Sequence, residues 1–152
     1  MQITLAAVGR SRPGPERALY DQYRQRLGWT LTLREVEEKR PLAAAVRKAR
    51  EGQLLLAAVP EGSLLVVLDE RGGLLASEEF ARRMGTWRDR GQSRVAFLIG
   101  GADGHDDAVR DRADLLMSLG KMTWPHMLVR AMLAEQLYRA ESILSNHPYH
   151  RG

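Results

Sequence analysis

Two short runs of apolar residues constrain the fold of this chain more than any other feature. The segments LLVVLD (residues 64–69) and SRVAFLIG (93–100) each contain five consecutive apolar residues. A strand with one face in water would alternate apolar and polar residues, so uninterrupted runs indicate strands that are covered on both faces. The N-terminal ITLAAV (3–8) has the same character. We therefore expect an α/β fold, with a mostly parallel sheet flanked by helices.

Segments with helical spacing alternate with these strands. Helices are expected at residues 16–27, 41 to about 59, 77 to about 90, and 125 to about 144. A further strand is expected at residues 30–36, which alternate in polarity. The residues ERGG (70–73) are predicted to turn the chain, and Ser77 is predicted to be a helix N-cap. With no linker or repeat, residues 1–152 are expected to form a single domain.

Composition narrows the class of protein. The chain has 152 residues and no cysteine, which excludes disulfides and thiolate metal sites. The histidines do not form a ligand pattern with a carboxylate, so no metal is expected. No apolar run is long enough to span a bilayer, so no contact with a membrane is expected. The segment MQITLAAVGR lacks the features of a signal peptide. The cytoplasm is therefore the expected location.

The charge distribution favours a nucleic-acid partner. The formal net charge is +4, and arginine supplies 20 of the 23 basic residues. Residues 10–50 contain eleven Lys/Arg and five Asp/Glu, whereas residues 103–114 contain five Asp and two Arg. A basic half with an acidic patch elsewhere suits binding of a polyanion on one face. GC-rich codon usage alone would also enrich arginine, so composition leaves both explanations open.

Three segments follow the carboxyl ends of predicted strands, where open parallel sheets bind ligands. They are residues 68–70, 100–104 (GGADG) and 119–124. The glycines of GGADG would let a ligand approach the backbone closely. The same residues would also make a tight strand-to-helix turn capped by Asp103 or Asp106. The sequence contains neither GxGxxG nor GxxxxGK[ST], so it lacks the signatures of dinucleotide and P-loop nucleotide sites.

Three longer motifs point to a known family. VAFLIGGADG, SLGKMTWPHMLVRAMLAEQLYRA and NHPYHRG occur in this order. Together they closely resemble the ribosomal RNA large-subunit methyltransferase H family of the SPOUT superfamily, and the resemblance covers essentially the whole chain. It implies methylation of N3 of a pseudouridine in 23S ribosomal RNA with S-adenosylmethionine as cofactor. It also implies a homodimer and a SPOUT fold whose C-terminal part forms a deep trefoil knot. Because the chain is small, we expect it to act on the assembled ribosome.

The resemblance also implies which residues hold the cofactor. The matching positions are Leu68, Gly100, Leu119, Gly120, Lys121, Met122, Thr123 and Trp124. One position departs from the family, which commonly has serine where this chain has Gly120. If the contact uses the backbone, glycine preserves it; if it uses the hydroxyl, a hydrogen bond worth about 0.5 to 1.5 kcal/mol is lost.

Catalysis needs help with a proton, because N3 of pseudouridine is an imide nitrogen and a poor nucleophile until it is deprotonated. The candidates for a base or a cation that favours the anion are Arg139, Tyr149, His150 and Arg151. For Arg139 the alternative is a surface ion pair with Glu135 at i, i+4. Asp69 or Glu70 could act as a base by location. The tail is expected to be ordered and to reach the methyl-transfer site, either its own or that of a partner subunit.

The C-terminal helix is expected to form the dimer contact. Its apolar stripe comprises Val129, Leu133, Leu137, Ala140 and Leu144, widened by Met127, Leu128 and Met132. Two other functions stay open at this point. One is a ribosome-binding SPOUT protein that has lost catalysis, which the departure at Gly120 would favour. The other is a SPOUT methyltransferase with a different RNA target, such as tRNA.

Overall fold

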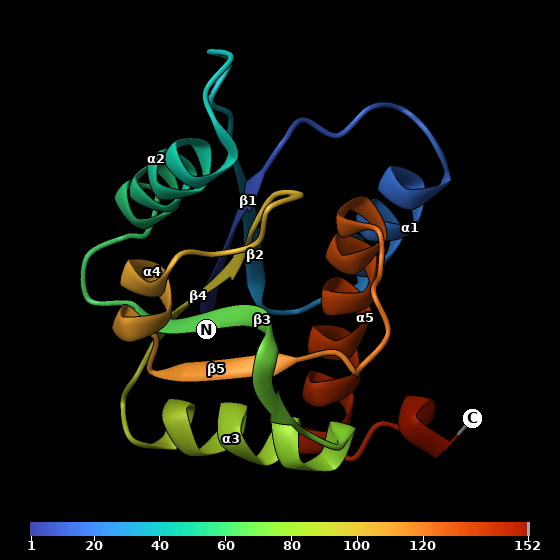
Figure 1. The fold of residues 1–152 in the computed structure, drawn as a ribbon. Helices are drawn as coiled ribbons and strands as arrows, with labels where there is room; N and C mark the ends of the chain where they lie inside the picture. The colour runs from blue at the N-terminus through green and yellow to red at the C-terminus, as the bar shows by residue number, and fades with distance from the viewer. Residues whose placement is uncertain (152) are drawn as a thin grey trace.

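The computed structural model describes residues 1–151, in which strands alternate with helices (Figure 1). The elements in chain order are β1 (Gln2–Val8), α1 (Pro15–Arg26), β2 (Thr30–Val36), α2 (Ala44–Ala57), β3 (Leu64–Leu74), α3 (Ser77–Asp89), β4 (Arg94–Ile99), α4 (Asp107–Arg112), β5 (Leu115–Ser118), α5 (His126–Leu144) and the 3-10 turn η1 (Pro148–Arg151). The strands form a five-stranded sheet of order β2-β1-β4-β3-β5, with every neighbouring pair parallel. The predicted parallel α/β fold is confirmed.

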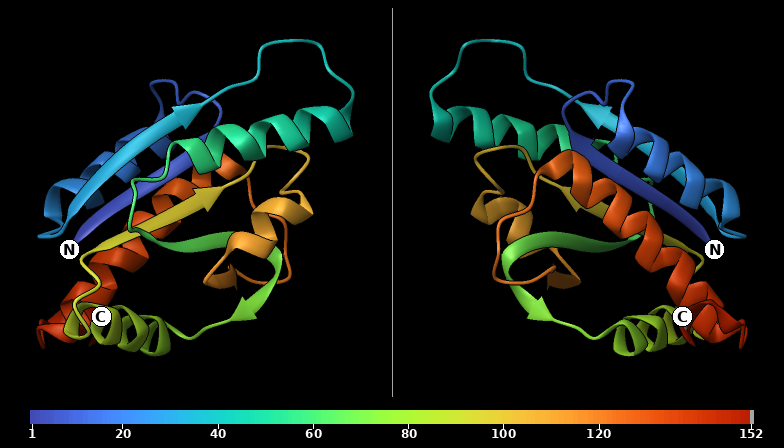
Figure 2. Two further views of the ribbon diagram at one scale, coloured as in Figure 1. Left: turned by 90° about the vertical axis from the view of Figure 1, so that its left-hand side faces the viewer. Right: turned by 90° about the vertical axis from the view of Figure 1, so that its right-hand side faces the viewer.

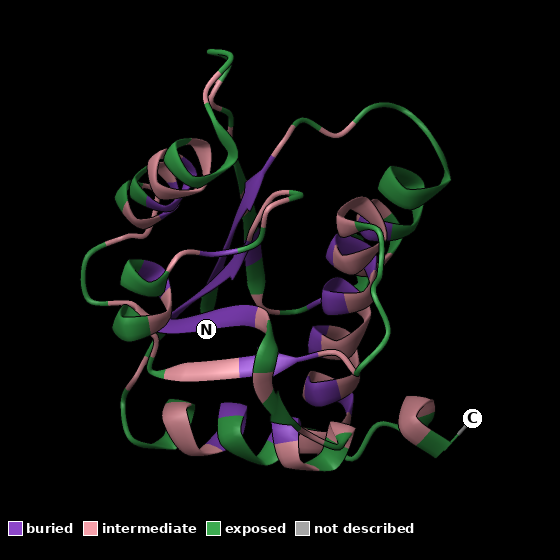
Figure 3. Ribbon diagram, viewed as in Figure 1, coloured by how far each residue is buried: buried purple, intermediate pink, exposed green. Residues whose placement is uncertain are grey.

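Helices cover both faces of this sheet. Helices α2 and α4 lie on one face, and α1, α3 and α5 lie on the other (Figures 1 and 2). Neighbouring residues of a central strand point to opposite cores: Phe97 packs on the α5 side and Leu98 on the α2 side, and both are fully buried. Figure 3 shows the same burial along the central strands. Two cores, one on each face, explain why these strands lack alternation.

Strand β3 departs from the prediction at its second half. The predicted turn at residues 70–73 is wrong, because β3 continues to Leu74 and pairs with β5 in two registers. Leu68 and Gly73 both lie opposite Met117, and the chain bulges between them. Figure 1 shows β3 bending after its first half and crossing in front of β5. A Cβ atom on Gly72 would lie 2.5 Å from the Met117 backbone nitrogen, so glycine is what permits this crossing.

The start of α3 also differs from the prediction. Ser77 is the first helical residue and not the N-cap; Ala76 takes that position, and no side chain caps the helix. The Ser77 hydroxyl instead donates a hydrogen bond of 2.8 Å to Oε1 of Gln136 on α5. Ser77 therefore links α3 to α5, although the sequence pattern predicted that it would cap α3.

Helix α5 uses its apolar stripe inside the protomer. Leu133, Leu137 and Ala140 are fully buried in the core between the sheet, α1 and α3. These three side chains cover the sheet and are not free for the predicted dimer contact, whereas Met127, Leu128, Val129 and Leu144 of the same prediction are only partly buried. Met132 lies outside the stripe and borders a cavity of about 480 Å³, together with the exposed Leu19 and Leu74. The exposed apolar surface beside α5 therefore lies around this cavity of about 480 Å³.

Candidate active site

The carboxyl ends of β4 and β5 and the bulge in the middle of β3 lie side by side and enclose a cavity of about 680 Å³, called here the strand-end cavity. Residues 68–71, 99–105, 117–120 and 122–126 supply nearly all of its lining. The three segments that the sequence placed at strand ends therefore come together at one edge of the sheet. The volume lies within the range of sites that bind small molecules and cofactors.

Seven of the eight predicted cofactor residues line this cavity: Leu68, Gly100, Leu119, Gly120, Met122, Thr123 and Trp124. Lys121 does not line it and is exposed. The apolar side chains of Met122 and Trp124 are 76% and 41% exposed. They form an open wall that a bound ligand would cover.

The loop that carries this wall folds back on itself. The Ser118 hydroxyl donates to the Gly120 carbonyl oxygen at 2.9 Å and accepts from the Gly120 amide at 3.2 Å. Trp124 Nε1 donates to the Leu119 carbonyl oxygen at 3.3 Å. Gly120 has φ of 118°, a left-handed conformation that strains any residue with a Cβ atom. Glycine at this position therefore suits the loop as it is folded here.

A buried ion pair fixes the floor of the cavity. Asp69 Oδ2 lies 3.1 Å from Arg110 Nη1, and both side chains are largely covered. Arg110 also donates to the His105 carbonyl oxygen, while Asp69 Oδ1 accepts from the Arg71 amide at 2.8 Å. Hydrogen bonding to Asp107 and then to Asp69 raises the pKa of Arg110. Asp69 is therefore engaged as a structural carboxylate, whereas Glu70 lines the cavity and is exposed.

Two buried polar side chains beneath the glycine pair were not identified from the sequence. His105 is 4% exposed, neither ring nitrogen has a hydrogen-bond partner in residues 1–151, and burial lowers its pKa. Burial, followed by the charge of Asp103, raises the pKa of Glu51. Cβ atoms on Gly100 and Gly101 would lie 3.2 Å from His105 Cε1 and 3.1 Å from Glu51 Oε2. The two glycines therefore also accommodate side chains packed behind them.

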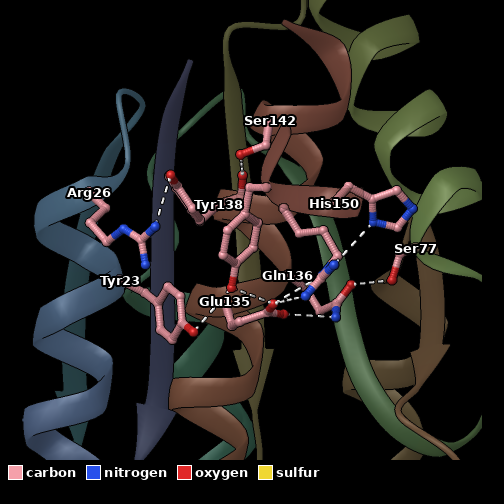
Figure 4. Close-up of polar contacts among 10 residues, drawn as sticks. Tyr23, Arg26, Ser77, Glu135, Gln136, Tyr138, Ser142 and His150 are labelled. Atoms are coloured by element: carbon pink, nitrogen blue, oxygen red, sulfur yellow. Dashed lines mark hydrogen bonds and ion pairs between the residues drawn. The ribbon is translucent and has the colours of Figure 1, made fainter. Parts of the chain in front are cut away.

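The predicted catalytic residues of the tail gather at the other end of α5. Arg139 Nε and Nη2 both donate to Glu135 Oε1, at 3.0 and 2.6 Å. The Tyr149 hydroxyl donates to the same oxygen at 3.0 Å and is hydrogen bonded to the Tyr23 hydroxyl at 3.1 Å. Figure 4 shows Glu135 between Tyr23 and Gln136. The i, i+4 ion pair exists, and it also anchors the tail.

His150 is held through both ring nitrogens. Nδ1 lies 3.1 Å from Arg139 Nη1, and Nε2 lies 2.8 Å from Glu78 Oε1. A guanidinium can only donate, so Nδ1 accepts, and the proton of a neutral ring is on Nε2, where it donates to Glu78. This bond to His150 lowers the pKa of Glu78. Arg151 is exposed and makes no ion pair within the described residues.

Within one protomer, the cluster formed by Arg139, Tyr149 and His150 lies apart from the strand-end cavity. Arg139, Tyr149, His150 and Arg151 are not among the residues that line it. Val129 is the last residue of α5 that borders the cavity, and the 10 residues from there to Arg139 correspond to roughly 15 Å of helix. The structure therefore brings three of the four predicted catalytic residues together, but not beside the cofactor residues.

Residues 1–151 contain neither a metal-binding cluster nor a membrane-spanning helix. No group of three or more His, Cys, Asp or Glu side chains is placed to hold a metal ion. None of the helices in this part of the chain has the length and hydropathy needed to cross a membrane.

Comparison with a protein family defines the class. Residues 1–150 match a family described as "Predicted SPOUT methyltransferase". A solved structure, a probable methylase family protein from Haemophilus influenzae Rd KW20, superposes with a TM-score of 0.62 at 12% identity and covers 97% of this chain and 69% of its own. That likeness supports the fold alone. The fold and the family match together define an α/β SPOUT methyltransferase.

Comparison with individual proteins is more specific. The chain is 64% identical to a ribosomal RNA large subunit methyltransferase H from Rhodospirillum centenum, over 100% of both chains. It is 62% identical to a protein of the same name from Paramagnetospirillum magneticum, over 99% of both. The chain therefore belongs to the ribosomal RNA large subunit methyltransferase H family. This confirms the predicted family and the predicted S-adenosylmethionine-dependent methyl transfer.

Proposed function

We propose that this protein methylates N3 of a pseudouridine in 23S ribosomal RNA, on the assembled ribosome in the cytoplasm. The shared name of full-length relatives supports a large-subunit ribosomal RNA substrate. The net charge of +4 suits a polyanionic partner. The observation that carries the proposal is the strand-end cavity, which the family's cofactor positions line in this chain.

The residues of the cavity fit S-adenosylmethionine. Leu68, Leu119 and Trp124 offer apolar surface for the adenine ring, and Gly100 and Gly120 let the ligand approach the backbone closely. The cofactor supplies an electrophilic methyl group on a sulfonium. Asp69, Glu70 and Asp103 are the carboxylates at this cavity, and Lys48, Arg71 and Arg110 bring positive charge to the same lining.

The protein's own task is then to orient the base and to manage one proton. Methyl transfer forms the N3–methyl bond, breaks the bond from methyl to sulfur, and releases the N3 proton. We assign Arg151 to RNA phosphate or to the imide anion, and Arg139 to holding the tail through Glu135. His150 would take the proton directly or through water, and Tyr149 would lie beside the base. In this structure His150 Nδ1 faces Arg139, so taking the proton requires the tail to leave that contact.

The distance along α5 supports a homodimer. A tail held roughly 15 Å of helix from its own cavity cannot serve it without moving, whereas a second copy can present its tail there. The exposed apolar residues Leu19 and Leu74, together with Met132, offer the contact surface that the buried stripe does not. A C-terminal trefoil knot is part of the same proposal, supported by the crossing of β3 over β5.

A mixed-dimer experiment tests the composite site. Thr123→Lys places a cation in the cavity that repels the sulfonium, and truncation after Ser145 removes the tail. Each variant alone should transfer tritiated methyl groups to ribosomes at least about a hundredfold more slowly than wild type. Randomly paired mixtures should recover about a quarter of wild-type activity, because half the dimers are mixed and each mixed dimer has one complete site.

Controls separate this proposal from its alternatives. The truncated protein should bind S-adenosylmethionine normally by calorimetry, and nucleoside analysis should identify the product. Dimeric variants that show no recovery when mixed would show that the tail does not act across subunits. An inactive ribosome-binding protein would bind no cofactor, and a tRNA methyltransferase would label tRNA and not ribosomes.

A further inference from the structure

A third cavity, of about 510 Å³, lies between the loop after β1 and the start of α1. Figure 1 shows this loop passing the N-terminal end of α5. None of its lining residues lines the strand-end cavity. Met127 and Arg130 of α5 border it, whereas His126 and Val129 border the strand-end cavity. The first turns of α5 therefore form a wall between the two.

Two buried donors at this cavity have no acceptor within residues 1–151. Tyr20 and Arg130 both line it and are 4% and 3% exposed. The Tyr20 hydroxyl and Arg130 Nε make no hydrogen bond. The other nitrogens of Arg130 are occupied by Glu35 and by the carbonyl oxygens of Val8 and Gly9. Buried polar groups without partners are uncommon, and two unpaired donors together call for an acceptor.

The surrounding charges also suit an anion. Arg12 and Arg17 line the cavity and form no ion pair within residues 1–151, unlike Arg10, which lies 3.4 Å from Glu37. Helix α1 starts there with no side-chain cap; Pro15 has no N–H, so Glu16 and Arg17 supply the amides of the first turn that the lack of a side-chain cap leaves unpaired. Glu16 and Asp21 also line the cavity and oppose an anion. Glu16 lies in the first turn of the helix and Asp21 in the second, so both bring negative charge close to a bound anion.

We propose that this cavity binds a phosphate group of the RNA substrate. It would hold the backbone beside the first turns of α5 while the target nucleotide enters the strand-end cavity on the other side. The substrate class rests on the proposed function, since a ribosomal RNA strand is what brings a phosphate to this surface. The donors are an arginine pair, a helix N-terminus, a tyrosine hydroxyl and an arginine Nε, a set that matches phosphate oxygens.

The test compares matched variants in two assays. Arg12→Gln with Arg17→Gln removes two of the four exposed arginines that line the cavity, Tyr20→Phe removes only a hydroxyl, and Glu16→Gln removes an opposing charge. Arg82→Gln with Arg83→Gln on α3 makes the same change in net charge at a distant surface. The first assay measures binding of ribosomes as a function of salt concentration. The second measures binding of inorganic phosphate to the protein alone by NMR, at constant ionic strength.

The arginine pair variant should weaken ribosome binding at least about tenfold and reduce the slope of log K against log salt by about one. Tyr20→Phe should weaken both phosphate and ribosome binding, Glu16→Gln should strengthen both, and all variants should bind S-adenosylmethionine normally. Effects no larger than those of the α3 control would overturn the site. Phosphate binding that depends on Tyr20, with an unchanged ribosome slope, would overturn the RNA assignment. Because phosphate binding needs no methyl transfer, it decides the site even if the proposed function fails.

Discussion

The crossing of β3 over β5 predicts that stability depends strongly on Gly72. Replacing Gly72 with alanine would put a Cβ atom 2.5 Å from the nitrogen and 2.6 Å from the carbonyl carbon of Met117. Both are backbone atoms of a strand that is paired on this side, so no side-chain rotation relieves the contact. At the neighbouring Gly73, the nearest atom would be the Leu116 carbonyl oxygen at 4.0 Å. Neither glycine has a left-handed φ, so conformational strain does not distinguish them.

The two substitutions should therefore differ by several kcal/mol. Overpacking a core costs about 1 to 3 kcal/mol when side chains adjust, and the upper end applies when backbone must move. Separating β3 from β5 also loses ladder hydrogen bonds worth about 0.5 to 1.5 kcal/mol each. We expect Gly72→Ala to lower the free energy of unfolding by at least about 3 kcal/mol. Gly73→Ala should change it by less than about 1 kcal/mol, because the added Cβ atom meets no close neighbour. Alanine also restricts the unfolded chain, which slightly favours the folded state.

Urea unfolding at one fixed protein concentration provides the measurement, with thermal unfolding as a second reading. A loss of 3 kcal/mol in a chain of this size corresponds to roughly 6 to 12 °C in Tm. Fixed concentration matters because dimerisation would make the midpoint depend on it. Equal midpoints for the two variants would refute the close approach of the two strands at Gly72.

Three further outcomes follow from the side chains. Burial raises the pKa of Tyr20 to about 12, so as the pH rises the unfolded chain loses this proton before the folded protein does, and unfolding is favoured. Between pH 10 and 12, the free energy of unfolding of wild type should fall by up to about 3 kcal/mol relative to that of Tyr20→Phe, measured by urea titration. Trp124→Ala should weaken S-adenosylmethionine binding about tenfold by calorimetry, and Lys121→Ala should leave it unchanged. Glu135→Gln should speed hydrogen exchange in residues 148–151 and slow methyl transfer without changing cofactor affinity.

The sequence predicted those parts of the fold that depend on local pattern. The uninterrupted run at residues 95–99 indicated a strand between two helical layers, and that strand is β4. The second half of β3 could not be predicted, because ERGG resembles a turn and becomes a strand only through its contact with β5. Helix α2 likewise begins at Ala44 and not at Pro41. Glu38 binds Arg40 and Arg50, which ties the preceding loop to the helix.

The candidate site also has a part that the sequence could predict and a part that it could not. The segments at strand ends were predictable, because parallel strands bring their carboxyl ends to one edge. His105 gave no periodic signal; its place directly after GGADG was the one available clue. The docking of Tyr149 on Tyr23 joins residues 126 positions apart, and spacing cannot predict such a contact. The unpaired donor of Arg130 could not be predicted either, because its burial depends on contacts with Glu35 and the β1 carboxyl end, far away in the sequence.

Helix α5 explains why one continuous motif carries residues for several tasks. Successive faces of the helix point to different surroundings: Val129 to the strand-end cavity, Arg130 to the proposed phosphate site, Leu133 to the core and Arg139 to the tail. A rigid helix fixes the spacing of these surroundings, so RNA held at one end and a tail held at the other keep a constant separation. Substitutions should therefore sort by face: those at the first turn should change binding of cofactor or RNA, and those near Arg139 should change turnover. Changes on the buried face, at residues such as Leu133, should reduce stability and both activities together, and so should removal of Arg130, whose buried guanidinium binds Glu35.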